Sequence, residues 1–139
     1  MQKLDSTTSI ETVISGSFRK HLRQIVQLKY LLEENGVKVL SPEGHFATNP
    51  EEEFIYLDSD LVQNPELLQS SVFAKIRRST FLVVANIEGY LGNAAILEIG
   101  YAIAIGIKVY CVESVDDPNI ASYCTLITEV LPNIILKMI

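Results

Sequence analysis

The segment that most restricts the fold of this chain is FLVVAN, residues 81–86. Its apolar residues follow one another without the alternation of apolar and polar residues that marks a strand with one face in water. Such a continuous apolar strand is typical of a parallel sheet that is covered by helices on both faces. The sequence therefore predicts an α/β fold.

Strand-like and helix-like segments alternate along the rest of the chain. The helix over residues 22–33 is expected to stop at Asn35 and Gly36, and the helix over 64–77 to start at Asn64. The alternation predicts one domain over residues 1–139, a Rossmann-like or flavodoxin-like three-layer sandwich with a parallel sheet of about five strands. The other strands are expected at 12–15, 37–42, 108–112 and 133–138, and the other helices at 93–105 and 118–130.

Composition narrows the function classes. The formal net charge of −6 argues against a nucleic-acid partner, because such proteins present a basic surface to phosphates. Glu98 and Lys108 interrupt the apolar stretch 94–112, so a buried helix and strand are expected there and no membrane partner. The polar N-terminal segment predicts a cytoplasmic location. Cys111 and Cys124 are expected to be reduced core residues, and neither a metal nor a cofactor is predicted.

Three segments are expected to meet at the carboxyl ends of the strands, where ligands bind in parallel sheets. They are residues 16–20 after the first strand, residues 86–92 after the third, and the start of the helix that carries Glu98. In the turn SGSFRK, Gly16 permits close approach of a ligand to the backbone, Ser17 starts a helix, and Arg19 can neutralise an anion. The alternative is a helix whose basic first turn is simply solvated.

Glu98 is the one carboxylate in the apolar segment 93–106. In the second turn of its helix, its side chain leans toward the helix N-terminus and hence toward the ligand edge. The helix dipole can keep it ionised there for a chemical role. A structural ion pair with Arg19, Arg77 or Arg78 explains a buried carboxylate equally well, and both interpretations stay open at this stage.

Three stretches together resemble a known family: GSFRK (16–20), LVVAN (82–86) and GYLGNAAILEIGYAIAIGIKVY (89–110). They resemble the nucleoside 2-deoxyribosyltransferase superfamily, which includes the 2'-deoxynucleoside 5'-monophosphate N-glycosidases, over about residues 13–112. The resemblance implies that Glu98 attacks the anomeric carbon of a sugar and forms a glycosyl-enzyme, which water or a second base resolves. A carboxylate suits this step, because it stabilises an oxocarbenium-like transition state and can trap it.

The resemblance also assigns binding residues. The turn after the first strand is most similar to that of the monophosphate-hydrolysing branch, which makes Gly16, Ser17 and Arg19 phosphate-binding. Gly92 and Asn93 are expected near the phosphate or the sugar. The remaining expected substrate contacts are Asn86, which ends the third strand, and Asn133, which in the transferases has a C-terminal counterpart that reaches a partner's pocket.

One departure concerns the catalytic acid. The family commonly has an aspartate at the opening of the third strand, where it handles the base or its proton, and this chain has Thr80 there. Asp58, or alternatively Asp60, in the motif YLDSD is a candidate to supply the missing acid.

The sequence thus predicts cleavage or transfer at the N-glycosidic bond of a nucleoside or its 5'-monophosphate by a homodimer or larger homo-oligomer. Two alternatives remain open. One is a nucleotide-binding module without efficient chemistry. The other is a different ribosyl hydrolase, either NAD-cleaving or a cytokinin-type phosphoribohydrolase.

Overall fold

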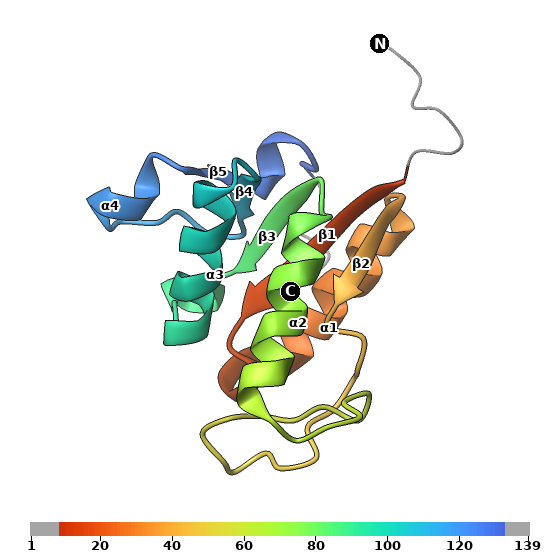
Figure 1. Ribbon diagram of the computed structural model, residues 1–139. Coiled ribbons are helices and arrows are strands. Elements are labelled where there is room, and N and C mark those ends of the chain that lie inside the picture. The colour runs from red at the N-terminus through yellow and green to blue at the C-terminus, as the bar shows by residue number, and fades with distance from the viewer. Residues whose placement is uncertain (1–8, 133–139) are drawn as a thin grey trace.

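The computed structural model describes residues 9–132 and contains one five-stranded parallel sheet (Figure 1). The strand order is β2-β1-β3-β4-β5. Every neighbouring pair is parallel, as the continuous apolar strand predicted. The strands are β1 (Ile10–Gly16), β2 (Val37–Ser41), β3 (Phe81–Ala85), β4 (Lys108–Cys111) and β5 (Cys124–Leu126).

Helices cover both faces of the sheet, which gives the three predicted layers. Helix α1 (Phe18–Glu34) packs on one face, where Ile25, Leu28 and Leu32 join a core with Ile14 and Val83. Helices α2 (Pro65–Arg77) and α3 (Asn93–Ala104) lie on the other face (Figure 1). Their core residues include Ile76, Ile99 and Ala102, packed against strand residues such as Leu82. Alternate residues of β3 therefore enter different cores, which is why its sequence shows no polar face.

Local capping chemistry sets the helix ends. Asn64 caps α2 by accepting a hydrogen bond from Leu67 N at 3.1 Å, and Pro65 occupies the first helical position. Helix α1 ends at Asn35, and Gly36 follows with a φ of +82°, a conformation that glycine adopts without steric cost. Both ends agree with the sequence prediction, and α1 begins at Phe18, directly after Ser17, which was expected at a helix start.

The helix predicted over residues 118–130 is wrong. The structure has a short helix α4 (Pro118–Ala121), then β5, then the 3-10 turn η2 (Ile127–Glu129). Asp117 caps α4, but residues 124–126 pair with the edge of β4 instead, with Cys124 beside Val109 and Leu126 beside Cys111. Pairing with an available strand edge overrides weak helix propensity. The strand predicted at 133–138 lies outside the described residues.

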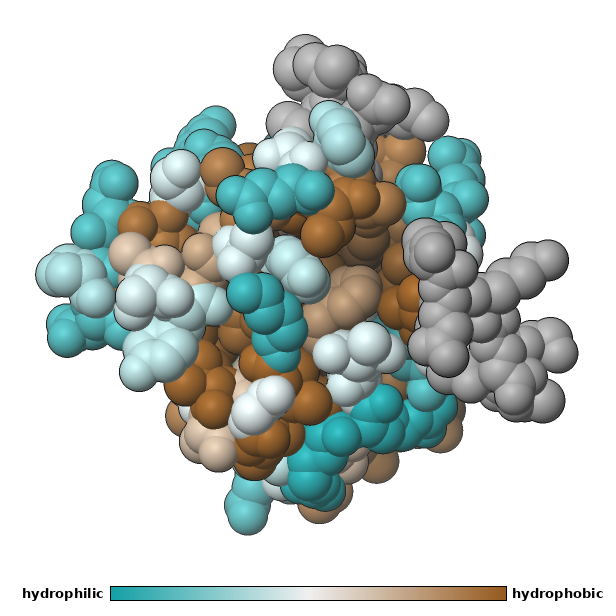
Figure 2. Space-filling view, turned by 90° about the horizontal axis from the view of Figure 1, so that it is seen from above, coloured by the Kyte–Doolittle hydropathy of each residue, from teal (hydrophilic) through white to brown (hydrophobic). Residues whose placement is uncertain are grey.

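The chain order places a crevice between β1 and β3. The connection from β1 leads outward to β2, and the connection through α2 returns to β3 on the other side of β1. In open parallel sheets this reversal leaves room for a ligand at the carboxyl ends of the strands. The long loop of residues 42–64 lies at that end (Figure 1), and Figure 2 views the opposite end, where hydrophobic and hydrophilic residues are interspersed.

None of the helices within residues 9–132 is both long enough and apolar enough to cross a membrane.

Candidate active site

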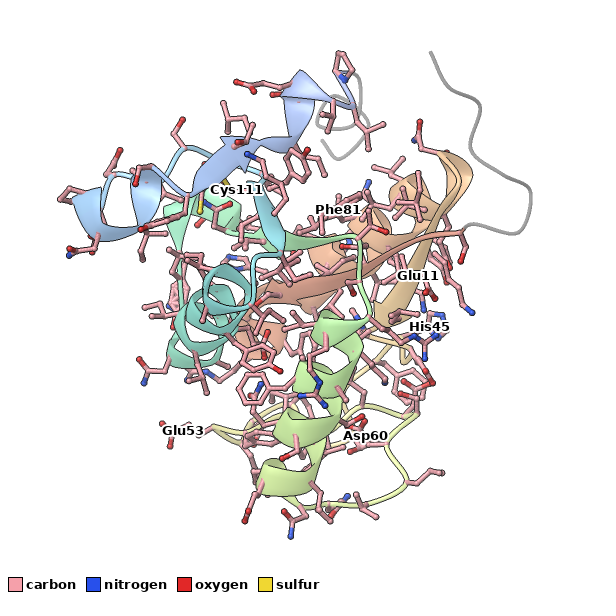
Figure 3. All side chains as sticks on the ribbon, turned by 45° about the horizontal axis from the view of Figure 1, so that its top comes forward. Glu11, His45, Glu53, Asp60, Phe81 and Cys111 are labelled. Carbon is pink, nitrogen blue, oxygen red and sulfur yellow. The ribbon has the colours of Figure 1, made fainter. Side chains whose placement is uncertain are left out.

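A cavity of about 530 Å³ lies at the carboxyl ends of β1 and β2. One wall, called here the strand-end wall, is formed by residues 14, 16–19, 90, 92–95 and 98, which include the starts of α1 and α3. The second, the loop wall, is formed by residues 41–43, 53–55, 57 and 59–62, and α2 completes the enclosure. Glu53 and Asp60 of the loop wall lie on opposite sides of α2 in the view of Figure 3, and both are far from Phe81 at the start of β3.

Glu98 lines this cavity with a side chain held on both oxygens. The hydroxyl of Ser15 donates to Oε1 at 2.6 Å, and the side-chain amide of Gln69 donates to Oε2 at 2.8 Å. Glu98 is 8% exposed and Ser15 is 1% exposed, so the carboxylate lies between a strand and a helix, away from bulk water. Both hydrogen-bond donors are uncharged.

The ion pair considered for Glu98 is not formed. Arg78 pairs with Glu11 at 3.1 Å, and Arg77 donates a hydrogen bond to the hydroxyl of Tyr101 at 2.7 Å. Arg19 lines the cavity, but the ion pairs found within residues 9–132 do not join it to Glu98. The partners of Glu98 are therefore hydrogen-bond donors that orient it without neutralising it.

Burial raises the pKa of the Glu98 carboxyl above the ordinary range for glutamate. The hydrogen bonds from Ser15 and Gln69 oppose this rise, because they favour the ionised form. A desolvated carboxylate with two donors and no counter-ion is a strong nucleophile toward a carbon that carries positive charge.

The turn after β1 contributes the start of α1 to the cavity. Ser17 is the N-cap, and its Oγ accepts a hydrogen bond from Lys20 N at 3.2 Å. Gly16 also has a packing role, since an added Cβ would lie 3.0 Å from both Ala85 O and Ile25 Cδ1. The ammonium of Lys20 lies 3.9 Å from the ring centre of Tyr90, which connects this turn to the segment after β3.

Gly92 and Asn93 lie at the start of α3 and line the same cavity. Gly92 is the N-cap, and Asn93 is the first helical residue. Two helix N-termini, those of α1 and α3, thus border one cavity. Their backbone N–H groups and dipoles favour an anionic group there.

Asn86 is a structural residue and does not line the cavity. It is 1% exposed, and its Oδ1 accepts hydrogen bonds from Val112 N and Glu113 N at 3.1 and 3.0 Å. Its Nδ2 donates to Glu113 O at 2.8 Å. The side chain therefore fastens the end of β3 to the segment after β4, and a substrate contact at Asn86 stays a prediction.

Asp58 is not among the residues that line the cavity, and its catalytic role stays a prediction. Its Oδ1 accepts hydrogen bonds from His45 N and Phe46 N at 2.7 and 3.1 Å, and these bonds lower the pKa of Asp58. Asp60 lines the cavity instead, and its Oδ2 accepts a hydrogen bond from Leu57 N at 2.8 Å. Asn133 lies outside the described residues.

Thr80 lies at the amino end of β3, the sheet edge opposite the cavity. Its backbone N–H donates to Glu11 O at 2.7 Å, and its hydroxyl accepts from Glu11 N at 3.3 Å. The absence of an aspartate at this position therefore does not alter the cavity. Helix α2 contributes uncharged residues and Lys75 to the cavity lining. The carboxylates that line the cavity therefore come from α3 and the loop wall.

Ser15 and Gln69 were not predicted as site residues. Ser15 had a recognisable feature, since it is a polar residue that precedes Gly16 in an apolar strand. Gln69 had none, because its contact with Glu98 depends on how α2 and α3 pack. Within residues 9–132 there is no group of three or more histidine, cysteine, aspartate or glutamate residues arranged to hold a metal ion, and both cysteines are free.

Comparison with solved structures places this geometry among known folds. The chain superposes on the CMP N-glycosidase BcmB of Clostridium botulinum with a TM-score of 0.50 and 16% sequence identity, covering 73% of this chain and 66% of that one. A conserved protein from Enterococcus faecalis V583 gives a TM-score of 0.47 and 16% identity, covering 75% of this chain and 63% of that one. This chain spans less than two thirds of either structure.

The likeness to BcmB shows a shared fold, and it agrees with the sequence resemblance to the nucleoside 2-deoxyribosyltransferase superfamily. No family model and no curated protein matches the sequence.

Proposed function

We propose that this protein cleaves the N-glycosidic bond of a nucleoside or its 5'-monophosphate, with Glu98 as the nucleophile. The observation that carries the proposal is the position of the Glu98 carboxylate, buried at the cavity wall and held by Ser15 and Gln69. The fold shared with a CMP N-glycosidase supports the same reaction class. Residues 16–19 and the start of α3 are suited to the phosphate, and the apolar part of the cavity to the base.

In the proposed reaction a Glu98 oxygen attacks the anomeric carbon as the bond to the base nitrogen breaks. The electron pair of that bond leaves with the base. Water then attacks the anomeric carbon, the carboxylate departs, and the proton released from water balances the one that a neutral base takes up. Ser15 and Gln69 hold the carboxylate in line for attack, which lowers the entropic part of the barrier.

The test is release of free base from a panel of nucleosides and 5'-monophosphates, measured by chromatography. We expect Glu98→Ala to lower kcat by about 10³-fold or more while substrate still binds, because the nucleophile acts in the transition state. If wild type binds a monophosphate but releases no base from any panel member, the protein is a nucleotide-binding module. A variant that only lowers Tm would make Glu98 a structural residue.

Arg19→Ala tests the phosphate end of the cavity. We expect KM to rise about tenfold for monophosphates and to change little for nucleosides, because a charge-assisted hydrogen bond to phosphate is lost. Arg23→Ala is the matched control, since Arg23 is an exposed cation of the same helix that does not line the cavity. Equal effects of the two variants would contradict a phosphate contact at Arg19.

We also propose a homodimer. Tyr90 and Tyr101 have partners within the chain, in Lys20 and Arg77 respectively. The support comes instead from the outer side of α3 and its C-cap, where Ile96, Leu97 and Ile105 are 46%, 54% and 41% exposed. A monomeric light-scattering mass at micromolar concentration would contradict the proposal.

A further inference from the structure

The charges that line the cavity are unevenly distributed between its walls. Among the described residues its carboxylates are Glu43, Glu53, Asp60 and Glu98, and its cations are Arg19 and Lys75. Lys75 pairs with Glu43 at 3.7 Å, so these two charges largely offset each other. Arg19 lies on the strand-end wall with the two helix N-termini, whereas Glu53 and Asp60 lie on the loop wall.

Apolar and aromatic side chains accompany the two acids of the loop wall. Phe54 is 38% exposed and lines the cavity next to Glu53 in the chain, and a ring in such a position attracts a flat cation. Asp60 is fixed by its hydrogen bond from Leu57 N, so its charge is held at the wall. The aliphatic residues that complete this region are Leu57, Leu61, Val62, Leu67, Leu68 and Val72.

We infer that the substrate is a nucleotide whose base carries a positive charge, a ring nitrogen quaternised by its glycosidic bond or by alkylation. This inference rests on the proposed glycosidase function and names the substrate class. The phosphate belongs at Arg19 and the helix N-termini, and the cationic base faces Phe54, Glu53 and Asp60. Such a ligand is zwitterionic, and its two charges match the two walls of the cavity.

The reaction chemistry agrees with this choice. A neutral base leaves with an electron pair and needs a proton from a cavity acid or from water. A cationic base takes the same electron pair and leaves neutral. A Glu98 oxygen forms the bond to the anomeric carbon, the carbon–nitrogen bond breaks, and water then releases the sugar phosphate, regenerating the carboxylate and freeing one proton to solvent.

The cationic ring also compensates for the missing counter-ion of Glu98. The carboxylate receives hydrogen bonds only from the neutral groups of Ser15 and Gln69 among the contacts formed within residues 9–132. A positive charge at the glycosidic nitrogen favours its ionised form as substrate binds. This attraction falls when the base becomes neutral, which assists product release.

The experiment compares nicotinamide mononucleotide with nicotinic acid mononucleotide. Both have the same labile pyridinium–sugar bond, but the added carboxylate leaves the second base with no net charge. We expect wild type to release base from the first with a kcat/KM at least about tenfold higher, because two wall carboxylates attract the cation. A parallel pair, 7-methylguanosine 5'-monophosphate and guanosine 5'-monophosphate, tests the same charge on a larger base.

Glu53→Gln and Asp60→Asn should each reduce this preference about fivefold, the effect of one exposed charge at close range. Glu51→Gln is the matched control, because Glu51 lies on the same loop outside the cavity lining and should leave the preference unchanged. Equal rates for the two pyridinium probes would overturn the inference. So would a preference for the cationic probe that both Glu53→Gln and Asp60→Asn leave intact. In either case, release of base would still support the glycosidase function.

If no probe releases base, the binding affinities of the two pyridinium mononucleotides distinguish the remaining outcomes. If no probe releases base but wild type binds nicotinamide mononucleotide at least about tenfold more tightly than its acid analogue, the charge preference holds and the glycosidase proposal fails. If no probe releases base and the two bind equally, both proposals fail.

Discussion

The two walls of the cavity are built in different ways. The strand-end wall consists of parallel strand ends and helix starts, in which Ser15, Gly16 and Asn93 are positioned by a continuous backbone hydrogen-bond network. The loop wall has one isolated bridge, between Ala47 and Leu57, and relies on side chains that bind the backbone. Under the proposed function, the reacting carboxylate belongs to the wall built from strand ends and helix starts, and ligand selection belongs to the irregular wall.

The strand-end wall keeps its shape through buried polar contacts as well as strand pairing. Asn86 connects β3 to the segment after β4 with three hydrogen bonds, and Ser15 connects β1 to Glu98 of α3. Buried polar groups of this kind are costly to disrupt, because their partners lose hydrogen bonds that water cannot replace. The loop wall is more exposed, so its contacts can be changed with smaller effects on stability.

The largest effect on stability is expected from Asn86→Ala. The change leaves the backbone groups of Val112 and Glu113 without their side-chain partner, and we expect the free energy of unfolding to fall by about 2 to 4 kcal/mol. Urea unfolding measures the loss, and Asn119→Ala, at an exposed asparagine of α4, is the control. A raised KM with unchanged stability would instead make Asn86 a substrate contact.

A smaller effect, on the pH dependence of activity, is expected from Gln69→Leu. The acid limb of kcat/KM in wild type should lie above the ordinary pKa of glutamate, because burial raises the pKa of Glu98 and the nucleophile must be ionised. The Gln69 hydrogen bond favours the ionised form, so its removal should move the limb to higher pH and lower kcat/KM about tenfold near neutrality. The pH profile with the best substrate measures both effects.

Stability should respond to pH in the opposite sense to activity. A carboxyl whose pKa is raised in the folded state binds its proton more tightly there than in the unfolded chain. The free energy of unfolding therefore falls as pH rises between the ordinary and the raised pKa of Glu98, and Gln69→Leu should steepen this fall. Gln63→Ala, at an exposed glutamine of the loop, should reproduce the wild-type profile. An unshifted acid limb in Gln69→Leu would contradict a role for Gln69 in positioning the carboxylate.

The sequence predicted the strand-end wall better than the loop wall, for a physical reason. The elements that form this wall are determined by residues close together in the sequence. The apolar strand at residues 81–86, the cap at Asn64 and the helix end at Gly36 each depend on neighbours within a few positions. Glu98 could be placed near a ligand because its helix position and direction follow from the same local pattern. Parallel strand order then brought residues 16–19 and 92–98 together.

The loop wall depends on contacts between residues far apart in the loop or in the chain. Asp58 and Asp60 are two positions apart in a segment without periodicity, and nothing in the sequence distinguished the one that binds His45 N from the one that lines the cavity. The contact between Gln69 and Glu98 spans 29 positions and requires the packing of α2 against α3. The edge pairing that turned residues 124–126 into β5 is likewise a tertiary effect.

The smallest effect is expected from Asp58→Ala, which tests whether the loop wall is held by side-chain contacts. Asp58 accepts hydrogen bonds from His45 N and Phe46 N, and Gly44 packs against it so closely that an added Cβ would lie 2.6 Å from its Oδ1. Loss of the carboxylate should loosen the wall and raise KM about threefold, with kcat nearly unchanged, because Glu98 is held by other elements.

The two hydrogen bonds lower the pKa of Asp58, so its contribution to the loop is present above the ordinary pKa of aspartate and is lost as pH falls through the lowered value. Asp58→Asn keeps an acceptor oxygen without the charge, and its KM should lie between those of wild type and Asp58→Ala. Glu51→Ala removes an exposed charge from the same loop outside the cavity lining, and KM should stay at the wild-type value. A fall in kcat as large as that of Glu98→Ala would show that Asp58 takes part in the reaction, and the division of roles between the two walls would then be wrong.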